Sequence, residues 1–207
     1  MQPKHLKQLA ILSVVLGVLM LVMMYGTQYW AKQRALSALP INTKMGGDFV
    51  LSSTQGQPLN SNSLRGKVVL LTFGFATCPD VCPLVLARMG QAVRELDDEA
   101  GKTQGVFISF DPARDTVDVL KPYVQHFYPS FIGATGTEAD IANVAKQYGV
   151  VYLKEDTGSA SGYGFTHSDY IYLIDQQGRV RKLYDTKAPV AEMTADMHLL
   201  LHEHEWF

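Results

Sequence analysis

The amino-acid sequence predicts an α/β domain with a mixed central sheet flanked by helices, preceded by one N-terminal transmembrane helix. Three observations support this prediction. A long apolar segment without charge lies near the N-terminus, apolar strands alternate with helical patterns in the middle of the chain, and a hairpin followed by a helix ends it. The chain has 207 residues, of which 47% are hydrophobic and 18% are charged, enough for one domain with a sizeable core.

The first expected element is a membrane anchor at residues 1–31. Residues 8–31 are uncharged, and a helix of that length spans roughly 36 Å, enough to cross the hydrocarbon core of a bilayer. Tyr25, Tyr29 and Trp30 would form an aromatic collar at one membrane surface. A cleaved signal peptide is the alternative, but the small residues that could serve for cleavage lie well beyond the apolar run, which favours an anchor.

Charge does not decide how this anchor is oriented, because Lys4 and Lys7 before it nearly balance Lys32 and Arg34 after it. A single N-terminal anchor usually leaves its amino end inside. We therefore expect a single-pass protein of the inner (cytoplasmic) membrane whose C-terminal domain faces the periplasm or the extracytoplasmic side. The formal net charge is −2, and no basic stripe indicates nucleic-acid binding.

A tether is expected at residues 32–45, which are polar and mixed, and the domain at residues 46–207. Within the domain, unbroken apolar runs predict buried strands, apolar residues at helical spacing predict helices, and Gly- or Ser-rich clusters predict turns. In chain order, the expected elements are a hairpin at 48–51 and 57–59, a strand at 68–73, a helix to about residue 96, a strand at 106–110, a helix at 116–127 that Pro122 bends or interrupts, a short extended segment at 131–134, a capped helix at 141–148, a strand at 150–153, a mobile loop at 156–164, a hairpin at 170–175 and 179–183, and a helix from about residue 190.

The two cysteines of the chain, Cys78 and Cys82, stand four residues apart between the strand at 68–73 and the helix that follows it. A helix start stabilises a thiolate through its dipole and its free amides. Residues i and i+4 share one helix face at roughly 6 Å, which suits a disulfide or two ligands of one soft metal ion. Two packed, unreactive cysteines are the structural alternative, but Pro79 and Pro83 favour a rim rather than a core.

A parallel strand that leads directly into a cysteine-bearing helix is typical of a thioredoxin-like fold. Reactive groups in such sheets gather at the carboxyl ends of the strands, where the end of the strand at 106–110 should also lie. His167, placed after the predicted mobile loop, is the candidate third ligand. Two thiolates and one imidazole suit Cu(I), and three protein ligands leave a coordination position open for passing the ion on.

Taken together, these motifs resemble the Sco/SenC family of membrane-anchored copper chaperones, which help to assemble cytochrome c oxidase. The resemblance implies a thioredoxin-like domain in which Cys78, Cys82 and His167 bind one copper ion. It also implies a client, the dinuclear copper site of cytochrome c oxidase subunit II, with other copper chaperones or thiol reductants as further partners. Family members often have Thr or His close before the first cysteine, where this chain has Ala76 and Thr77. The resemblance covers residues 46–186 and rests on Gly47-Asp48-Phe49, Gly66-Lys67, Cys78-Pro79-Asp80-Val81-Cys82-Pro83, Ser109-Phe110-Asp111-Pro112-Ala113-Arg114-Asp115-Thr116, Phe131-Ile132-Gly133-Ala134-Thr135-Gly136, and His167-Ser168 before Tyr172-Leu173-Ile174-Asp175.

An enzyme is the alternative to a chaperone. A tethered thiol–disulfide reductase would use Cys78 and Cys82 as a redox pair and keep the copper-ligand cysteines of the client reduced. His167 distinguishes the two hypotheses, because a reductase does not require it. A peroxidase is less well supported, since such enzymes have a Thr three residues before the reactive cysteine, where this chain has Phe75.

Two further pairs of residues allow a functional and a structural interpretation. Asp111 and Asp115 could support the metal site or meet a client, but we favour roles in a turn and as a helix cap. His198 and His202 are spaced i, i+4 and could chelate a metal ion from a helix. For these histidines we favour the solvated face of a helix whose other side is core.

Overall fold

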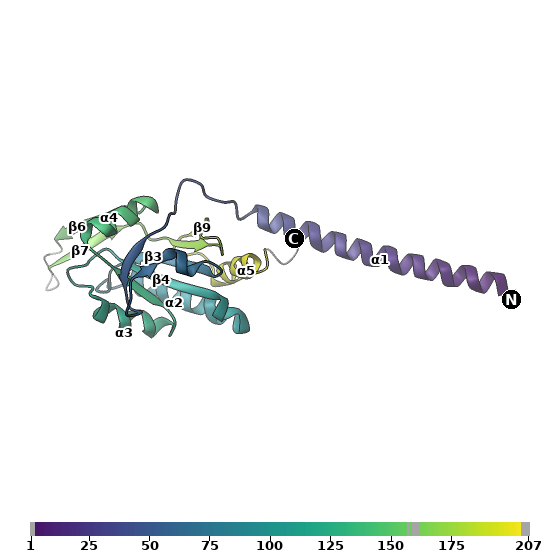
Figure 1. The fold of residues 1–207 in the computed structure, drawn as a ribbon, viewed down its shortest axis with the longest axis horizontal. Coiled ribbons are helices and arrows are strands. Elements are labelled where there is room, and N and C mark those ends of the chain that lie inside the picture. The colour runs from purple at the N-terminus through teal and green to yellow at the C-terminus, as the bar shows by residue number, and fades with distance from the viewer. Residues whose placement is uncertain (1–2, 157, 159–161, 204–207) are drawn as a thin grey trace. The chain divides into compact units, whose positions relative to one another are not determined.

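The computed structural model describes residues 3–156, 158 and 162–203, which form two units, Met1–Leu39 and Pro40–Phe207. The first unit contains helix α1 (Pro3–Ser37), drawn in purple in Figure 1. Within Ile11–Ser37 the mean hydropathy reaches 2.0, so this helix is long and apolar enough to cross a membrane. The helix extends past residue 31 into the segment expected to be a tether, because residues 31–37 include no Gly or Pro and are mostly good helix formers.

The second unit is built on a seven-stranded mixed sheet with the order β2-β1-β5-β4-β3-β8-β9. The central strands β3, β4 and β5 are parallel, and the other pairings are antiparallel. All residues of β3 and β4 are buried, as expected for strands covered on both faces. The strands of this sheet are β1 (Val50–Ser53), β2 (Leu59–Asn60), β3 (Val68–Gly74), β4 (Thr103–Ser109), β5 (Ile132–Thr135), β8 (Ile171–Ile174) and β9 (Val180–Tyr184).

Helices cover both faces of this sheet, as Figure 1 shows for α4 on one side and for α2 and α3 on the other. Phe107 of β4 contacts Tyr123 of α3, whereas Phe73 of β3 points to the opposite face and contacts Tyr148 at the end of α4. The sheet and its helices therefore enclose two apolar layers. The helices are α2 (Val81–Arg94), α3 (Val117–Phe127), α4 (Glu138–Gln147) and α5 (Val190–Leu201), with short 3₁₀ helices η1 (Ser61–Leu64) and η2 (Asp97–Lys102).

Most of the expected elements are present with small shifts of their ends. Thr137 caps α4 through a reciprocal capping box with Asp140, as the sequence pattern indicates. Pro122 does not interrupt its helix, since α3 is continuous from Val117 to Phe127.

The segment from residue 150 to His167 differs from its prediction. Strand β6 (Tyr152–Asp156) and strand β7 (Tyr163–His167) pair with each other in a separate antiparallel sheet. Part of the expected mobile loop is therefore strand, while residues 157 and 159–161 of that loop lie outside the described residues. His167 is consequently the last residue of a strand, paired with Tyr152, and does not belong to a loop.

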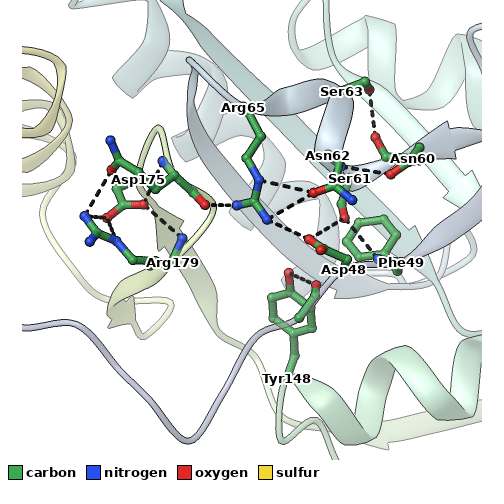
Figure 2. Close-up of polar contacts among 12 residues, drawn as sticks. Asp48, Phe49, Asn60, Ser61, Asn62, Ser63, Arg65, Tyr148, Asp175 and Arg179 are labelled. Carbon is green, nitrogen blue, oxygen red and sulfur yellow. Dashed lines mark hydrogen bonds and ion pairs between the residues drawn. The ribbon is translucent and has the colours of Figure 1, made fainter.

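A polar network ties the chain together at the start of β3, the end of the sheet opposite the cysteine loop. Figure 2 shows Arg65 between Asp48 and the turn that joins β8 to β9. Its guanidinium donates to Asp48 at 2.7 Å and to Asn62 at 3.2 Å, and it also donates to the backbone oxygen of Gln177. This network joins segments that are far apart in the sequence. It lies at the end of β3 away from the cysteines, which follow the carboxyl end of that strand.

Candidate metal centre

The candidate centre is built on the loop of residues 75–80, which joins β3 to α2. Cys78 lies in this loop and Cys82 lies in the first turn of α2, which begins at Val81. The Cys82 amide donates a hydrogen bond to Cys78 Sγ at 3.5 Å. The sulfur of Cys78 thus pairs with one of the amides at the helix start that have no partner within the helix. The two cysteines do not share one helix face as expected. Instead, Cys82 is a residue of the helix, whereas Cys78 lies in the loop before it and is stabilised by an amide at the helix N-terminus.

The two thiols also differ in exposure. Cys78 is half-buried, whereas Cys82 is only 3% exposed, so the expected position on a rim holds for Cys78 alone. Gly74 makes room for the buried sulfur, because a Cβ atom at this position would lie 2.7 Å from Cys82 Sγ. A glycine at the end of β3 is thus a steric requirement of the centre.

The electrostatics of the pair follow from this arrangement. The pKa of Cys78 is lowered to about 3, mainly because the thiol of Cys82 donates a hydrogen bond to it, with His167 contributing and burial opposing. The pKa of Cys82 is raised, because its proton is held in that hydrogen bond and because the sulfur is buried. These opposite shifts favour a thiolate on Cys78 and keep the proton on Cys82.

His167 reaches the cysteines from β7, 85 positions further along the chain than Cys82. Its Nε2 atom lies 3.9 Å from Cys82 Sγ. On the other side of the ring, Nδ1 is 3.2 Å from the backbone oxygen of Ser168 and 2.9 Å from Oδ1 of Asp169. A proton on Nδ1 would be shared with the Ser168 oxygen, so Nε2 faces the sulfurs, where it hydrogen-bonds to Cys78. Loss of the Nε2 proton would leave that nitrogen able to bind a metal ion, the arrangement common for histidine ligands.

The same contacts explain how His167 and Asp169 titrate. Burial lowers the pKa of His167, but hydrogen bonds to Cys78 and Ser168 and the charge of Asp169 outweigh it, so the pKa is raised. Burial raises the pKa of Asp169, while the charge of His167 opposes that shift. Asp169 was not identified from the sequence. A carboxylate two residues after a candidate histidine ligand could have suggested that it contacts the imidazole.

Aromatic side chains form the wall behind the histidine. The ring of Phe110 lies 4.8 Å from that of His167 and is stacked on Tyr152 at 4.9 Å, while Phe75 and Phe165 complete the cluster. Phe75 directly follows β3 and Phe110 directly follows β4, so both rings lie at the carboxyl ends of central strands. These rings keep water from one side of the centre.

Asp115 connects the loop after β4 to the cysteine loop. This residue is fully buried and accepts hydrogen bonds from the Ala76 amide at 2.7 Å and from Ser109 Oγ at 2.5 Å. It does not cap α3, because Thr116 is the cap and accepts from the Val119 amide. The expected cap role of Asp115 is therefore wrong, and its side chain instead supports the backbone at Ala76, two residues before Cys78.

Asp111 binds the hairpin that carries His167. It accepts a hydrogen bond from the Tyr163 hydroxyl at 2.8 Å and pairs with Arg114. The Arg114 guanidinium stacks on the Tyr163 ring at 3.7 Å and donates to the Tyr163 backbone oxygen at 3.0 Å. The structural interpretation of Asp111 fits these contacts, since the residue anchors the start of β7 to the loop after β4.

His198 and His202 do not contribute to the cysteine centre. They lie at the end of α5 and contact Glu99 of η2, beyond the end of α2. The cysteines lie at the start of α2, and its 14 residues span about 21 Å.

Comparisons with known proteins place this chain among copper-binding relatives. A family model described as SCO1/SenC matches residues 38–202. The SCO2-like protein of Rickettsia felis is 37% identical over 185 residues, which cover 88% of this chain and 90% of the relative. The copper-bound crystal structure of ScoI from Arabidopsis thaliana matches with a TM-score of 0.72 at 34% identity, covering 77% of this chain and 99% of that one. The copper-bound structure of ScoI from Bradyrhizobium japonicum matches with a TM-score of 0.70 at 36% identity, covering 76% and 99%. These matches confirm the predicted thioredoxin-like fold.

Proposed function

This chain belongs to the SCO1/SenC family, and we propose that it is a membrane-anchored metallochaperone that delivers copper to the dinuclear copper site of cytochrome c oxidase subunit II. The observation that supports this proposal most directly is the meeting of Cys78, Cys82 and His167 from separate parts of the chain. Copper-bound relatives with the same fold support copper as the cargo.

The donor set suits a soft ion. Cys78 already supplies a thiolate, His167 presents Nε2, and Cys82 would release its proton when the ion binds. A sulfur and a nitrogen bound to one ion at about 2.0–2.3 Å lie roughly 3.6–3.8 Å apart, so the observed separation of 3.9 Å requires little movement. Three ligands leave one position open, on the side where Cys78 is partly exposed, for a ligand of the client.

We further propose that α1 anchors the domain to the inner membrane and that the domain faces the periplasm or extracytoplasmic side. The apolar character of Ile11–Ser37 supports the anchor, and an oxidising compartment suits a thiol pair that requires controlled reduction. Other copper chaperones that load the centre, and thiol reductants that keep it reduced, are the further partners that this function requires.

A thiol–disulfide reductase is the second candidate, and the low pKa of Cys78 is the observation that favours it. A stabilised thiolate with a second cysteine in contact is the arrangement that such enzymes use to reduce a disulfide of the client. In this hypothesis His167 is not needed, because the largest cause of the lowered pKa is Cys82 rather than the imidazole.

Copper content tests the proposed centre. The reduced full-length chain in detergent should bind one equivalent of Cu(I) tightly, and Cys78→Ala or Cys82→Ala should abolish that binding. Oxidation to the disulfide should do the same, because both donors are then used up. His126→Ala, which alters an exposed histidine of α3, is the matched control and should bind normally. Tight copper binding by either cysteine variant would show that the ligand set is wrong.

His167→Ala separates the chaperone from the reductase. The variant should bind copper at least tenfold more weakly, since it loses a ligand, yet reduce a model disulfide at nearly the wild-type rate. Cells with only this variant should lose oxidase activity, and added copper should restore part of it. Normal oxidase assembly at limiting copper would instead support the reductase and contradict the chaperone.

A further inference from the structure

A second group of potential metal ligands lies at the opposite end of α2 from the cysteines. Helices α2 and α5 run side by side in the same direction. Arg88 of α2 donates to the Ala188 backbone oxygen, just before α5, at 2.8 Å. Further along both helices, Thr194 of α5 donates to Glu95, at the end of α2, at 3.0 Å. Because the two helices run in the same direction, Glu99, which lies in η2 just beyond the end of α2, lies next to the last turn of α5.

At this position two imidazoles converge on one carboxylate. Nδ1 of His198 lies 2.7 Å from Oε2 of Glu99, and Nε2 of His202 lies 2.7 Å from Oε1. The two rings are 4.6 Å apart, and the three donor atoms lie within 4.8 Å of one another. The i, i+4 spacing explains why both rings leave α5 on one side. Glu99 is the member of this group that sequence spacing could not supply.

The chemistry of this group matches a divalent metal ion. Two histidines and one glutamate form a ligand set that holds Zn²⁺ in proteins, at about 2.0–2.2 Å from each donor. Donors around a tetrahedral ion at that distance are roughly 3.3 Å apart, so the 2.7 Å contacts would open by only about half an ångström. The ion would replace the protons that now join the imidazoles to the carboxylate.

The surroundings also favour a positive charge. His202 is the C-cap of α5, so the site lies at the negative end of the helix dipole, next to free carbonyl groups. Asp97 and Asp98 precede Glu99 in the first turn of η2. Lys102 is the competing cation, at 3.3 Å from Glu99, but its side chain is 55% exposed and a surface pair of this kind is weak.

We propose that Glu99, His198 and His202 form a second metal site that binds one divalent ion of borderline softness, for which Zn²⁺ is the probe. The site is separate from the cysteine centre and does not depend on the copper-delivery function. A cysteine centre selects a soft ion, whereas nitrogen and oxygen donors select a borderline one, so the two sites take different ions or oxidation states.

The test uses the full-length chain in detergent with the first centre removed by Cys78→Ser, Cys82→Ser and His167→Ala. Titration with Zn²⁺ should show one bound equivalent. Adding His198→Ala or His202→Ala to this background should weaken binding at least tenfold, because loss of outer-sphere partners alone costs about that much. Glu99→Gln, which keeps the size and removes the charge, should also weaken it. His126→Ala, an exposed histidine on α3, should leave it unchanged.

A spectroscopic measurement identifies the ligands independently of affinity. Cu²⁺ added to the same background should give an electron paramagnetic resonance signal split by two imidazole nitrogens, reduced to one by His198→Ala. The thermal unfolding midpoint of each variant, measured without metal, should fall by no more than a few degrees, because His198 is exposed and Glu99 and His202 are only half-buried. Absence of Zn²⁺ binding, or binding that persists when both histidines are replaced, would overturn the proposal.

Discussion

At the scale of single residues, Cys78 and Cys82 are chemically unequal although they stand in one short motif. Cys82 is buried, and its thiol donates a hydrogen bond to Cys78. Cys78 is partly exposed, and its sulfur also accepts a hydrogen bond from the Cys82 amide. Cys78 is therefore the better nucleophile for thiol exchange, and in the proposed centre it is the ligand that needs no deprotonation before a metal ion binds.

The alkylation rate of Cys78 as a function of pH measures this inequality. Because the pKa of Cys78 is lowered to about 3, its thiolate is fully formed throughout pH 5–8, and its reaction with iodoacetamide should be nearly independent of pH there. An ordinary thiol, with a pKa of about 8.5, would react about ten times faster for each pH unit gained. Mass spectrometry of the labelled peptide gives the rate.

Cys82→Ala is the informative variant for this measurement, because it removes the largest cause of the shift. The pKa of Cys78 should then rise toward its ordinary value, and its alkylation at pH 5–6 should slow at least tenfold. A wild-type rate that increases tenfold per pH unit across pH 5–8 would show that the thiolate is not stabilised.

At the scale of elements, the centre depends on two loops that leave neighbouring parallel strands. Gly74 of β3 pairs with Ser109 of β4, so the loops that follow them start side by side. Asp115 joins these loops through the Ala76 amide, and its carboxylate is shielded from solvent. The position of Cys78 is thus set partly by a residue of the other loop.

Asp115→Ala should loosen the cysteine loop. Loss of the acceptor leaves the Ala76 amide unpaired, at a cost of about 1–3 kcal/mol, which corresponds to roughly 5- to 150-fold more frequent opening of the loop. Hydrogen exchange of the peptide covering residues 75–80, followed by mass spectrometry, measures this opening. Asp118→Ala, at an exposed position of α3, is the matched control and should leave exchange unchanged. Equal exchange in the Asp115 variant and in the wild type would show that Asp115 does not hold the cysteine loop in place.

The β6–β7 hairpin is the element that delivers His167. Its strands pair only with each other among the described residues, so side-chain contacts position it against the sheet. Tyr163 is held by Asp111 and Arg114, and Phe165 packs on Phe75 and Phe110. An imidazole on a hairpin held by side chains can adjust toward an ion more easily than one on a central strand.

In the molecule as a whole, the chain combines one apolar helix with one domain that contains both proposed metal sites. The cysteine centre and the Glu99 group lie at opposite ends of α2. If α1 anchors the domain as proposed, the domain stays at one membrane surface, where a membrane-bound client would also lie.

Labelling of Cys78 tests on which side of the membrane the domain lies. In cells whose outer membrane alone is permeable, a membrane-impermeant maleimide should label the reduced chain, because Cys78 is partly exposed. Cys78→Ser should remove this labelling, since Cys82 is only 3% exposed. Labelling that appears only after the inner membrane is broken would place the domain in the cytoplasm.

Elements with local signals could be predicted from the amino-acid sequence. Unbroken apolar runs predicted β3 and β4, and the Thr137 capping pattern predicted the start of α4. The order of a buried strand followed by a helix predicted that the two cysteines lie where β3 leads into α2. These predictions succeeded because periodicity, capping and strand-to-helix order depend on neighbours in the chain. His167 was a candidate ligand from its residue type and its place in the chain, the family resemblance supported it, and the structure brings it to the cysteines.

Contacts between residues that are distant in the sequence could not be predicted in this way, because they depend on how the whole chain packs. Tyr163–His167 has a weak local pattern for a strand, and Phe165 packs against Phe75 and Phe110, which directly follow β3 and β4. Asp115 has the sequence context of a helix cap but accepts its hydrogen bonds from Ser109 and the cysteine loop. Glu99 joins His198 only because two helices are packed side by side. Long-range contacts of this kind result from packing the whole chain, and no short window of sequence contains them.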